Sequence, residues 1–474
     1  MRPSFVVSLR KDVRATEDPN GDIRLEWPGG RITVREPGPG LGASILALAD
    51  GGATEETLGD LAAREAHVRD VARLYHYLAR WGQLGLLRYV AAAGTEELAA
   101  IEPMSPAFTF QPRETLPGHR YVLSRFACCR REGGRLVLES PLACGRVVFW
   151  DPAGPALLAG LATPSTPDDL GGTEKTRALL DLLLTAGMLE SVGESGRTEE
   201  DENIALRQWE FHDLLFHSRS RAGRTDGPYG GVYSYRNEIP PLPALKSSMS
   251  ADTIALDRPD IAALSRRDLP FTGVLEERRS IREYGDQPVT RAQLDAFLYR
   301  AARVRALVPP GHWQYEGSNR PYPGGGACYE LEIYAAVNRC DGLAPGLYHY
   351  DPLGHALARL RGLDTLVQDL LAESAWVTAP HPLQIVFGIT ARFQRLAWKY
   401  RGMAYAVMLK DVGALYQTMY LVAAAMDLAP CAAGGGSADL LAQAIGTEYH
   451  VESAVGEFLL GSRRSAELPR DESR

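Results

Sequence analysis

Residues 276–290 read EERRSIREYGDQPVT, and this stretch opens the part of the chain whose pattern decides the fold. Within five residues it places three guanidinium groups and one hydroxyl, those of Arg278, Arg279, Ser280 and Arg282. Like charges this close repel one another unless an anion lies among them, and guanidinium groups match phosphate oxygens in bidentate geometry. The stretch therefore favours an anion-binding turn, with a solvated basic turn as the alternative.

Two glycine-rich stretches follow in the same half of the chain. Residues 320–334 read RPYPGGGACYELEIY, and residues 428–446 read LAPCAAGGGSADLLAQAIG. Their glycines are Gly324, Gly325 and Gly326 in the first and Gly434, Gly435 and Gly436 in the second. Glycine lets the backbone pass close to a flat ligand, although a plain turn is the alternative for either stretch. Neither shows the GxGxxG spacing of a nucleotide-binding strand–turn–helix unit, so a Rossmann site is not expected.

Lys399 and Tyr400 are adjacent in the stretch TARFQRLAWKYRGMAYAV, residues 390–407. The chain contains only five lysines, and arginine supplies nearly all of its positive charge. Lysine and tyrosine both titrate near pH 10 in water, but burial can lower the pKa of a lysine towards neutrality and make it a general base. The alternative is an ordinary lysine whose charged end reaches solvent from a helix.

The pattern around these stretches predicts an α+β domain over residues 263–466. Apolar segments such as ELEIYAAVN, PLQIVFGIT and VGEFLLG are typical of strands. Residues 410–428, KDVGALYQTMYLVAAAMDL, predict a long amphipathic helix. Helical stretches alternate with strands, as in other α+β domains.

Two similar stretches precede this domain, residues 1–95 and residues 105–195. Each contains apolar strands, then leucine-rich helices, a glycine and a short apolar strand, which predicts a tandem of small winged-helix modules. The polar, acidic run GESGRTEEDEN begins at Gly193, and an aromatic- and arginine-rich segment follows it. We expect a linker and an extended arm over residues 196–262.

The composition argues against several classes of protein. A net charge of −8 leaves no excess of cations for general nucleic-acid binding. No run of about 18 apolar residues indicates a transmembrane helix, and the first residues do not resemble a signal peptide. The six cysteines show no paired spacing, so we expect reduced thiols and a cytoplasmic location. The absence of HExxH and CxxC spacings predicts no metal site.

In this order, these stretches resemble the nitroreductase-like flavoprotein superfamily over about residues 205–465. More narrowly, they look like its SagB-type or McbC-like branch, the azoline dehydrogenases of peptide natural-product biosynthesis. RRSIREYGDQPVT looks like the phosphate-binding signature, RPYPGGGACYELEIY like the glycine loop, and RLAWKY like the Lys-Tyr motif. The resemblance implies a C-terminal nitroreductase-like domain that binds FMN in a homodimer.

The resemblance also implies a role for each matching residue. Lys399 would act as the catalytic base, and Tyr400 would orient it or relay its proton. The implied FMN-binding residues are Arg278, Arg279, Ser280, Arg282 and Arg463 at the phosphate, Gly324, Gly325 and Gly326 against the ring, Gln417 on the core helix, and Gly434 and Gly435 with backbone N–H groups at the N5 edge.

The implied reaction oxidises a thiazoline or oxazoline ring to a thiazole or oxazole in a ribosomally made precursor peptide. A cyclodehydratase that forms the ring is an expected partner. The N-terminal tandem resembles winged-helix leader-recognition elements, in which the leader adds a strand to an exposed sheet edge. Scaffolding is the alternative role for one or both modules.

Two other functions stay open at this point. One is an FMN oxidoreductase that acts on another peptide, on a carrier-bound substrate or on a small molecule. The other is a non-catalytic scaffold that binds a leader.

Overall fold

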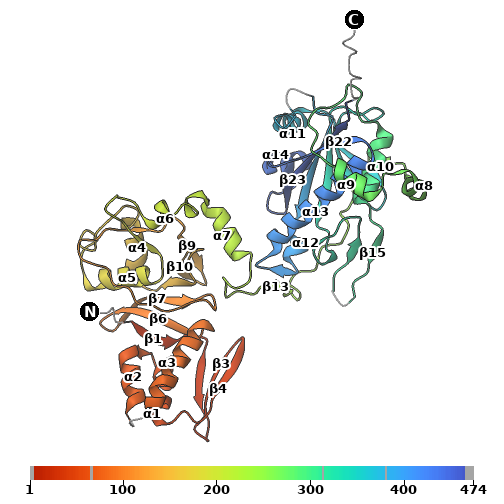
Figure 1. Ribbon diagram of the computed structural model, residues 1–474. Helices are drawn as coiled ribbons and strands as arrows, with labels where there is room; N and C mark the ends of the chain where they lie inside the picture. Colours follow the sequence, from red (N-terminus) through yellow and green to blue (C-terminus); the bar gives the residue numbers. More distant parts are fainter. Residues whose placement is uncertain (1–4, 65–67, 312–313, 379–381, 465–474) are drawn as a thin grey trace. The chain divides into compact units, whose positions relative to one another are not determined.

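The computed structural model describes residues 5–64, 68–311, 314–378 and 382–464. They form two compact units, residues 1–227 and residues 228–474 (Figure 1). The division falls inside the stretch predicted as linker and arm, and the predicted domain end at residue 466 lies outside the described residues. No helix within the described ranges is both long enough and apolar enough to cross a membrane.

The N-terminal unit is built on one seven-stranded antiparallel sheet. Its strands, in spatial order, are β5 (Ala53–Thr54), β1 (Val6–Leu9), β6 (Leu87–Ala93), β7 (Glu96–Pro103), β11 (Gly145–Phe149), β10 (Arg135–Glu139) and β9 (Cys128–Glu132). A tight turn with Gly94 at a φ of 61° joins β6 to β7, so the two strands pair as a hairpin. The two predicted modules therefore contribute strands to one sheet and side chains to one core.

Helices follow strands in both halves of this unit. A three-stranded sheet, β2 (Arg14–Glu17), β3 (Ile23–Trp27) and β4 (Gly30–Val34), precedes α1 (Pro39–Ala49), α2 (Glu55–Ala63) and α3 (Val68–Gln83). The second half contains α4 (Ala153–Gly160), α5 (Glu174–Thr185) and the strand pair β8 (Tyr121–Leu123) and β12 (Leu189–Ser191). Helices α2 and α5 both begin at a threonine whose side chain accepts a backbone N–H of the first turn. The three-stranded sheet followed by three helices agrees with the winged-helix prediction.

The C-terminal unit confirms the predicted α+β class. Its seven-stranded sheet runs, in spatial order, β14 (Thr253–Ala255), β19 (Ala356–Arg361), β18 (Gly346–Asp351), β17 (Leu331–Val337), β20 (Ile385–Arg392), β23 (Glu452–Ser462) and β22 (Leu428–Ala433). All neighbouring pairs are antiparallel. Besides the four helices that pack on this sheet, the described part of this unit contains β13 (Gly230–Gly231), α8 (Ile261–Arg267), α9 (Phe271–Glu277), β15 (Ala306–Val308), β16 (Gly317–Asn319), the 3₁₀ turn η2 (Gly325–Ala327), α12 (Phe393–Ala397) and β21 (Tyr400–Arg401).

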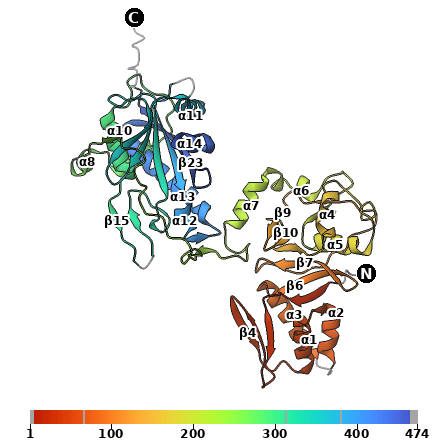
Figure 2. The same ribbon diagram turned by 180° about the vertical axis from the view of Figure 1, so that it is seen from behind.

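Helices cover both faces of this sheet (Figures 1 and 2). Strand β17, LEIYAAV, is buried throughout, and its side chains alternate between two apolar clusters. Leu331 and Ile333 pack with α10 (Arg291–Ala302) and α13 (Ala404–Ala425). Tyr334 and Ala336 pack with α11 (Thr365–Ala375) and α14 (Ala438–Ile445). The predicted long helix is α13, which begins six residues earlier than expected.

The stretch predicted as an extended arm is only partly extended. In the N-terminal unit it contains α6 (Glu199–Glu202), the 3₁₀ turn η1 (Leu206–Gln208) and α7 (Phe211–Arg219). Helix α7 forms because Leu214 and Ser218, one turn apart, provide a buried stripe. In the C-terminal unit, residues 228–252 contain little regular structure beyond β13, as an arm should.

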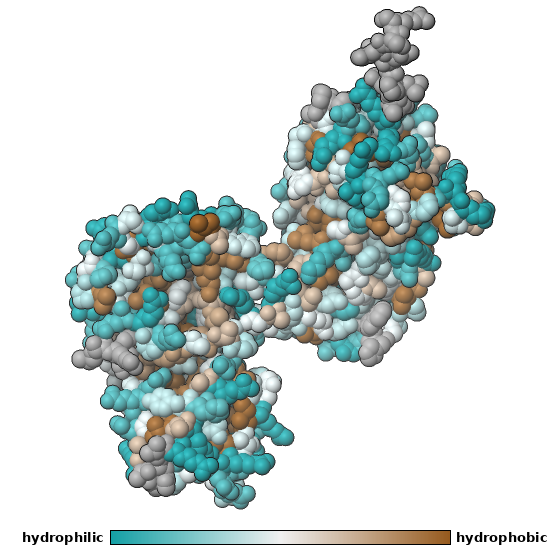
Figure 3. Space-filling model, viewed as in Figure 1, coloured by the Kyte–Doolittle hydropathy of each residue, from teal (hydrophilic) through white to brown (hydrophobic). Residues whose placement is uncertain are grey.

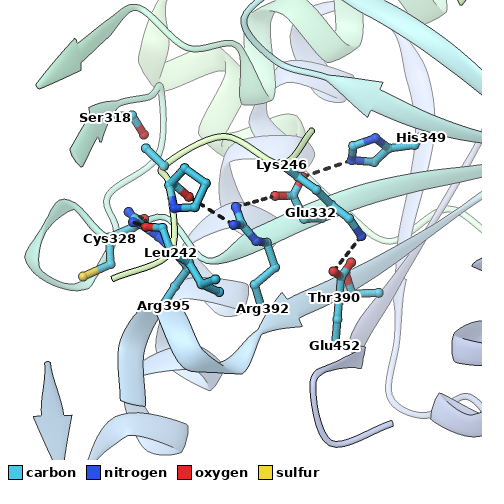
Figure 4. Close-up of polar contacts among 12 residues, drawn as sticks. Leu242, Lys246, Ser318, Cys328, Glu332, His349, Thr390, Arg392, Arg395 and Glu452 are labelled. Carbon is cyan, nitrogen blue, oxygen red and sulfur yellow. Dashed lines mark hydrogen bonds and ion pairs between the residues drawn. The ribbon is translucent and has the colours of Figure 1, made fainter. Parts of the chain in front are cut away.

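Buried charged side chains fasten this second part of the arm to the sheet (Figure 4). Lys246 Nζ lies 2.7 Å from Glu452 Oε2, and Arg392 donates to the Pro243 carbonyl at 3.1 Å. Arg392 also pairs with Glu332, whose other oxygen contacts His349 at 3.1 Å. The arm is therefore a fixed part of the C-terminal unit and reaches its interior.

Candidate active site

Lys399 lies between α12 and β21 with only 8% of its surface exposed. Its Nζ donates a hydrogen bond of 2.7 Å to the Tyr315 hydroxyl. The same nitrogen lies 5.0 Å from the ring centroids of Tyr315 and Tyr400, and 5.9 Å from that of Tyr233. The lysine is thus enclosed by aromatic rings and does not extend to solvent.

Tyr315 connects Lys399 to the glycine loop, residues 324–326. Its hydroxyl donates to the carbonyl of Gly326 and accepts from the lysine. Gly326 has a φ of 60°, and a Cβ at this position would lie 2.3 Å from Lys399 Nζ and 2.7 Å from the Tyr400 hydroxyl. A side chain here would be strained by the positive φ and would displace the lysine amine from its present position.

The arm completes the surroundings of the lysine. Strand β13 pairs with β21, and the Tyr233 N–H donates to the Lys399 carbonyl at 3.0 Å. Trp398 donates its indole N–H to the Ile239 carbonyl at 2.6 Å, and Arg395 donates to the Leu242 carbonyl at 2.5 Å. Lys399 therefore lies where the arm, the glycine loop and the Lys-Tyr segment meet.

Burial changes the acid–base properties of this cluster. Desolvation lowers the pKa of Lys399, and the neighbouring Cys328 thiol partly opposes the shift. Desolvation raises the pKa values of Tyr315 and Tyr400, so both phenols keep their protons. The amine is the group in this cluster whose pKa moves towards neutrality, as a general base requires.

A pair of buried carboxyl groups lies behind the glycine loop. Asp411 on α13 accepts the N–H of Gly325 at 2.7 Å. Glu330 is completely buried beside Asp411, and no other described residue donates an N–H or a cationic group to its carboxyl oxygens. Burial, followed by the nearby Asp411 carboxyl, raises the pKa of Glu330 to about 8.

The arginine cluster lies near the other end of α13. Ser280 and Tyr420 share a hydroxyl–hydroxyl hydrogen bond of 2.7 Å, and the Arg278 guanidinium lies 5.4 Å from the Tyr420 ring centroid. Arg279 and Arg282 are exposed. Among the described residues none of these three arginines forms an ion pair, so their charge is available to an anion.

The second glycine stretch lies beside this cluster. The Tyr420 hydroxyl accepts the N–H of Ala432 at 2.7 Å, and Gly434 and Gly435 follow β22 directly with open space around them. Gln417 is exposed one turn before Tyr420. Arg463 instead pairs with Asp427.

The expected site residues therefore form two groups within one chain. Lys399, Tyr400 and residues 324–326 form the first, and the arginine cluster with Gly434 forms the second. On α13, Asp411 contacts the first group and Tyr420 contacts the second. Nine residues of helix lie between these two contacts, which corresponds to about 13 Å along the helix axis. Sequence patterns did not indicate Tyr233, Tyr315, Glu330, Asp411 or Tyr420, because none belongs to a recognisable spacing.

Three family models match this chain. The ThcOx helix turn helix domain matches residues 1–112, the cyanobactin oxidase ThcOx matches residues 121–226, and the nitroreductase family matches residues 275–458. The last match confirms the nitroreductase-like resemblance of the quoted stretches, and the first supports the helix-turn-helix character of the N-terminal unit.

Two relatives match parts of the chain. A nitroreductase homologue of Methanocaldococcus jannaschii is 32% identical over 188 residues, which cover 39% of this chain and 85% of the homologue. The microcin B17-processing protein McbC of Escherichia coli is 33% identical over 111 residues, which cover 22% of this chain and 40% of McbC. The second match agrees with the McbC-like resemblance.

Solved structures are similar to about half of the chain. A nitroreductase homologue of Ralstonia eutropha shares 22% identity with a TM-score of 0.35, and covers 51% of this chain and 100% of its own. The E. coli microcin synthetase McbBCD complex, with truncated pro-MccB17 bound, shares 18% identity with a TM-score of 0.34, and covers 53% of this chain and 92% of its own.

We expect Glu330→Gln to make stability less dependent on pH. The pKa of Glu330 is raised from an ordinary 4.5 to about 8 in the folded protein. The buried, protonated Glu330 therefore contributes fully to the free energy of unfolding below pH 4.5. This contribution is lost as the pH rises through 8, and the loss is at most about 1.4 kcal/mol per pH unit. Urea unfolding from pH 5 to pH 9 should show Glu330→Gln gaining on the wild type as the pH rises. Parallel curves for the two proteins would contradict this assignment.

Proposed function

This chain belongs to the nitroreductase family of oxidoreductases, and from that premise we propose that it uses FMN to oxidise thiazoline or oxazoline rings to thiazoles or oxazoles in a ribosomally made precursor peptide. The observation that carries the proposal is Lys399, a buried amine with a lowered pKa held against a glycine loop. The matched models and relatives named for a cyanobactin oxidase and for microcin B17 processing support a peptide substrate.

Lys399 takes the proton from the carbon next to the ring nitrogen. Tyr315 holds the amine against the glycine loop, and the rings of Tyr233 and Tyr400 exclude water from it. Tyr315 keeps its own proton, because burial raises its pKa and its hydroxyl donates to the Gly326 carbonyl. Oxidation of the ring also removes a hydride equivalent, and FMN, when bound, would supply its acceptor.

The cofactor would be held by residues of both groups along α13. Arg278, Arg279 and Arg282, which form no ion pair among the described residues, provide guanidinium groups for the FMN phosphate, and Ser280 adds a hydroxyl. Gly434 and Gly435 leave open space where a flat ring can approach the backbone. Gly324, Gly325 and Gly326 would lie against the ring from the side of Lys399.

The substrate requires a partner reaction and a means of delivery. An azoline forms only by cyclodehydration of a cysteine, serine or threonine residue, so a cyclodehydratase must act first. The N-terminal unit offers the edges of the β2–β3–β4 sheet, where β4 has no second strand partner within the described residues. A leader can add there as a further strand through backbone hydrogen bonds.

A homodimer would bring the two groups together. On α13, whose other residues apart from Lys410 are buried or half-buried, Tyr405, Leu409, Gly413 and Gln417 form an exposed stripe at four-residue spacing. Tyr405 is 46% and Leu409 39% exposed, and Figure 3 shows apolar patches on the C-terminal unit in the region of this helix. A second copy packed on this stripe would cover it and could place its own arginine cluster near Lys399.

Removal of the base should abolish turnover without loss of cofactor. In an assay with an azoline-bearing peptide, Lys399→Ala should lower kcat by about 10²–10⁴-fold, the usual contribution of a general base. Tyr315→Phe should lower kcat by about tenfold, equivalent to about 1.4 kcal/mol of lost positioning. Lys11→Ala, which changes an exposed lysine of the N-terminal unit, is the control. Full activity of Lys399→Ala with bound flavin would exclude Lys399 as the base, and a colourless protein that FMN does not reconstitute would exclude the enzyme itself.

A leader should act on binding and leave the chemical step unchanged. The same azoline core peptide, assayed with and without its leader, should show a lower KM and the same kcat when the leader is present. If the azoline is untouched in both peptides, the substrate assignment is wrong and another oxidation must be sought.

Leu409→Glu should separate a dimer into monomers. A charge at the centre of an apolar contact is costly to bury, so light scattering should show a mass near 51.7 kDa and flavin should be released. Leu307→Glu is a matched control, because Leu307 on β15 is also 39% exposed. A wild-type protein that is already monomeric, or a Leu409→Glu protein that stays dimeric, would refute the role of this stripe.

A further inference from the structure

Glu330 is the most anomalous polar side chain of the C-terminal unit. It directly precedes β17, is 0% exposed, and no other described residue donates an N–H or a cationic group to its carboxyl oxygens, so its side-chain neighbour is the Asp411 carboxyl. An isolated charge in such a place is very costly, so a buried carboxyl group is either paired or protonated. Glu332, two residues later, is a buried carboxyl group of the paired kind, with His349 and Arg392 as its partners. Among the described residues Glu330 forms no such ion pair, and its nearest charged neighbour is another carboxyl group, so protonation is the course that the surroundings favour.

Asp411 faces Glu330 from α13. Its carboxylate accepts the Gly325 N–H at 2.7 Å, and this hydrogen bond favours the ionised form of Asp411 over the neutral form. The loop lies directly on the helix at this point, since a Cβ on Gly325 would lie 2.3 Å from Val407 Cγ1. Asp411 is therefore the anchor of the glycine loop.

Two adjacent buried carboxyl groups cannot both be charged at low cost. Burial and the Asp411 charge both raise the pKa of Glu330, whereas the Gly325 N–H opposes the rise for Asp411. Arg320 is the cation that faces Glu330, and Lys410 is the one beside Asp411 on α13. The hydroxyls of Tyr322 and Tyr400 face the pair as neutral groups, and so does the Cys328 thiol, whose pKa burial raises.

We propose that Glu330 keeps a proton at neutral pH, so that the Glu330–Asp411 pair carries one negative charge and Asp411 can hold the glycine loop in place for the base. The contacts run without a break from this pair to Lys399. Asp411 holds Gly325, the next residue Gly326 accepts the Tyr315 hydroxyl, and Tyr315 holds the lysine. Glu330 and Asp411 are thus positioning residues, and their value for catalysis rests on the function proposed above.

Loss of the Glu330 proton should loosen the loop. With both carboxyl groups ionised, repulsion separates them and the Asp411–Gly325 hydrogen bond is weakened. The loop also contains hydrogen bonds from the N–H groups of Ala327 and Cys328 to the carbonyls of Gly324 and Gly325. The amides of residues 325–328 therefore report on the anchor, whether or not flavin or substrate is present.

Hydrogen exchange of the full-length protein tests this proposal without any measurement of activity. After correction for the intrinsic pH dependence of exchange, the amides of residues 325–328 should be about tenfold less protected at pH 9 than at pH 7. This factor is expected if the loop opens more easily once Glu330 has lost its single proton, since the pKa of Glu330 lies near 8. Glu330→Gln removes the ionisation and should keep protection constant over this range. Asp411→Asn keeps an oxygen for the Gly325 N–H, removes the second charge, and should also give constant protection.

Asp295→Asn is the matched control. Asp295 on α10 is 1% exposed, has one unpartnered carboxyl oxygen within the described part of the chain, and has a pKa raised by burial. This variant should behave as the wild type does in residues 325–328. Protection that is constant in the wild type, or that falls equally in Glu330→Gln and Asp411→Asn, would overturn the proposal. Because flavin and azoline play no part in this readout, its failure is distinct from failure of the proposed oxidation.

Discussion

The contact between Gly326 and Lys399 is the constraint on which the candidate site depends. A side chain at Gly326 would meet the lysine nitrogen at 2.3 Å, so the loop and the amine occupy adjoining space with nothing between them. Together with the surrounding rings of Tyr233, Tyr315 and Tyr400, the loop buries Lys399, and desolvation lowers its pKa. It also brings the Gly326 carbonyl within reach of Tyr315, which fixes the direction of the amine. The glycine loop thus contributes both to the position of the Lys399 amine and to its lowered pKa.

Helix α13 is the common support of everything around this contact. Its first half holds the glycine loop through Asp411, and Tyr420 near its other end contacts Ser280 and Arg278. The sheet buries one side of the helix through β17, while an exposed stripe remains on the other. The arrangement is consistent with a site shared between two copies of the chain, in which each α13 supports part of the cofactor and part of the base.

The sequence predicted what depends on local patterns. The strand at β17, a long helix in the region of α13, the family-like stretches around Lys399 and the α+β class were all predicted from the sequence. Tyr315 and Asp411 were not, because their contacts with Lys399 and Gly325 span 84 and 86 residues and arise only from the fold. Helix α7 was missed because its buried stripe is only two residues long. The hairpin at Gly94 likewise joins two modules that look separate in the sequence.

The titration of Lys399 tests the central claim most directly. The chain has only five lysines, so NMR of protein labelled with ¹³C at lysine Cε can follow each one, and a Lys399→Met variant assigns its signal. The account predicts that Lys399 titrates clearly below the ordinary lysine pKa and that its signal shifts further when Tyr315 is replaced by Phe. A Lys399 that titrates near the ordinary value of about 10.4, unaffected by Tyr315→Phe, would contradict the account.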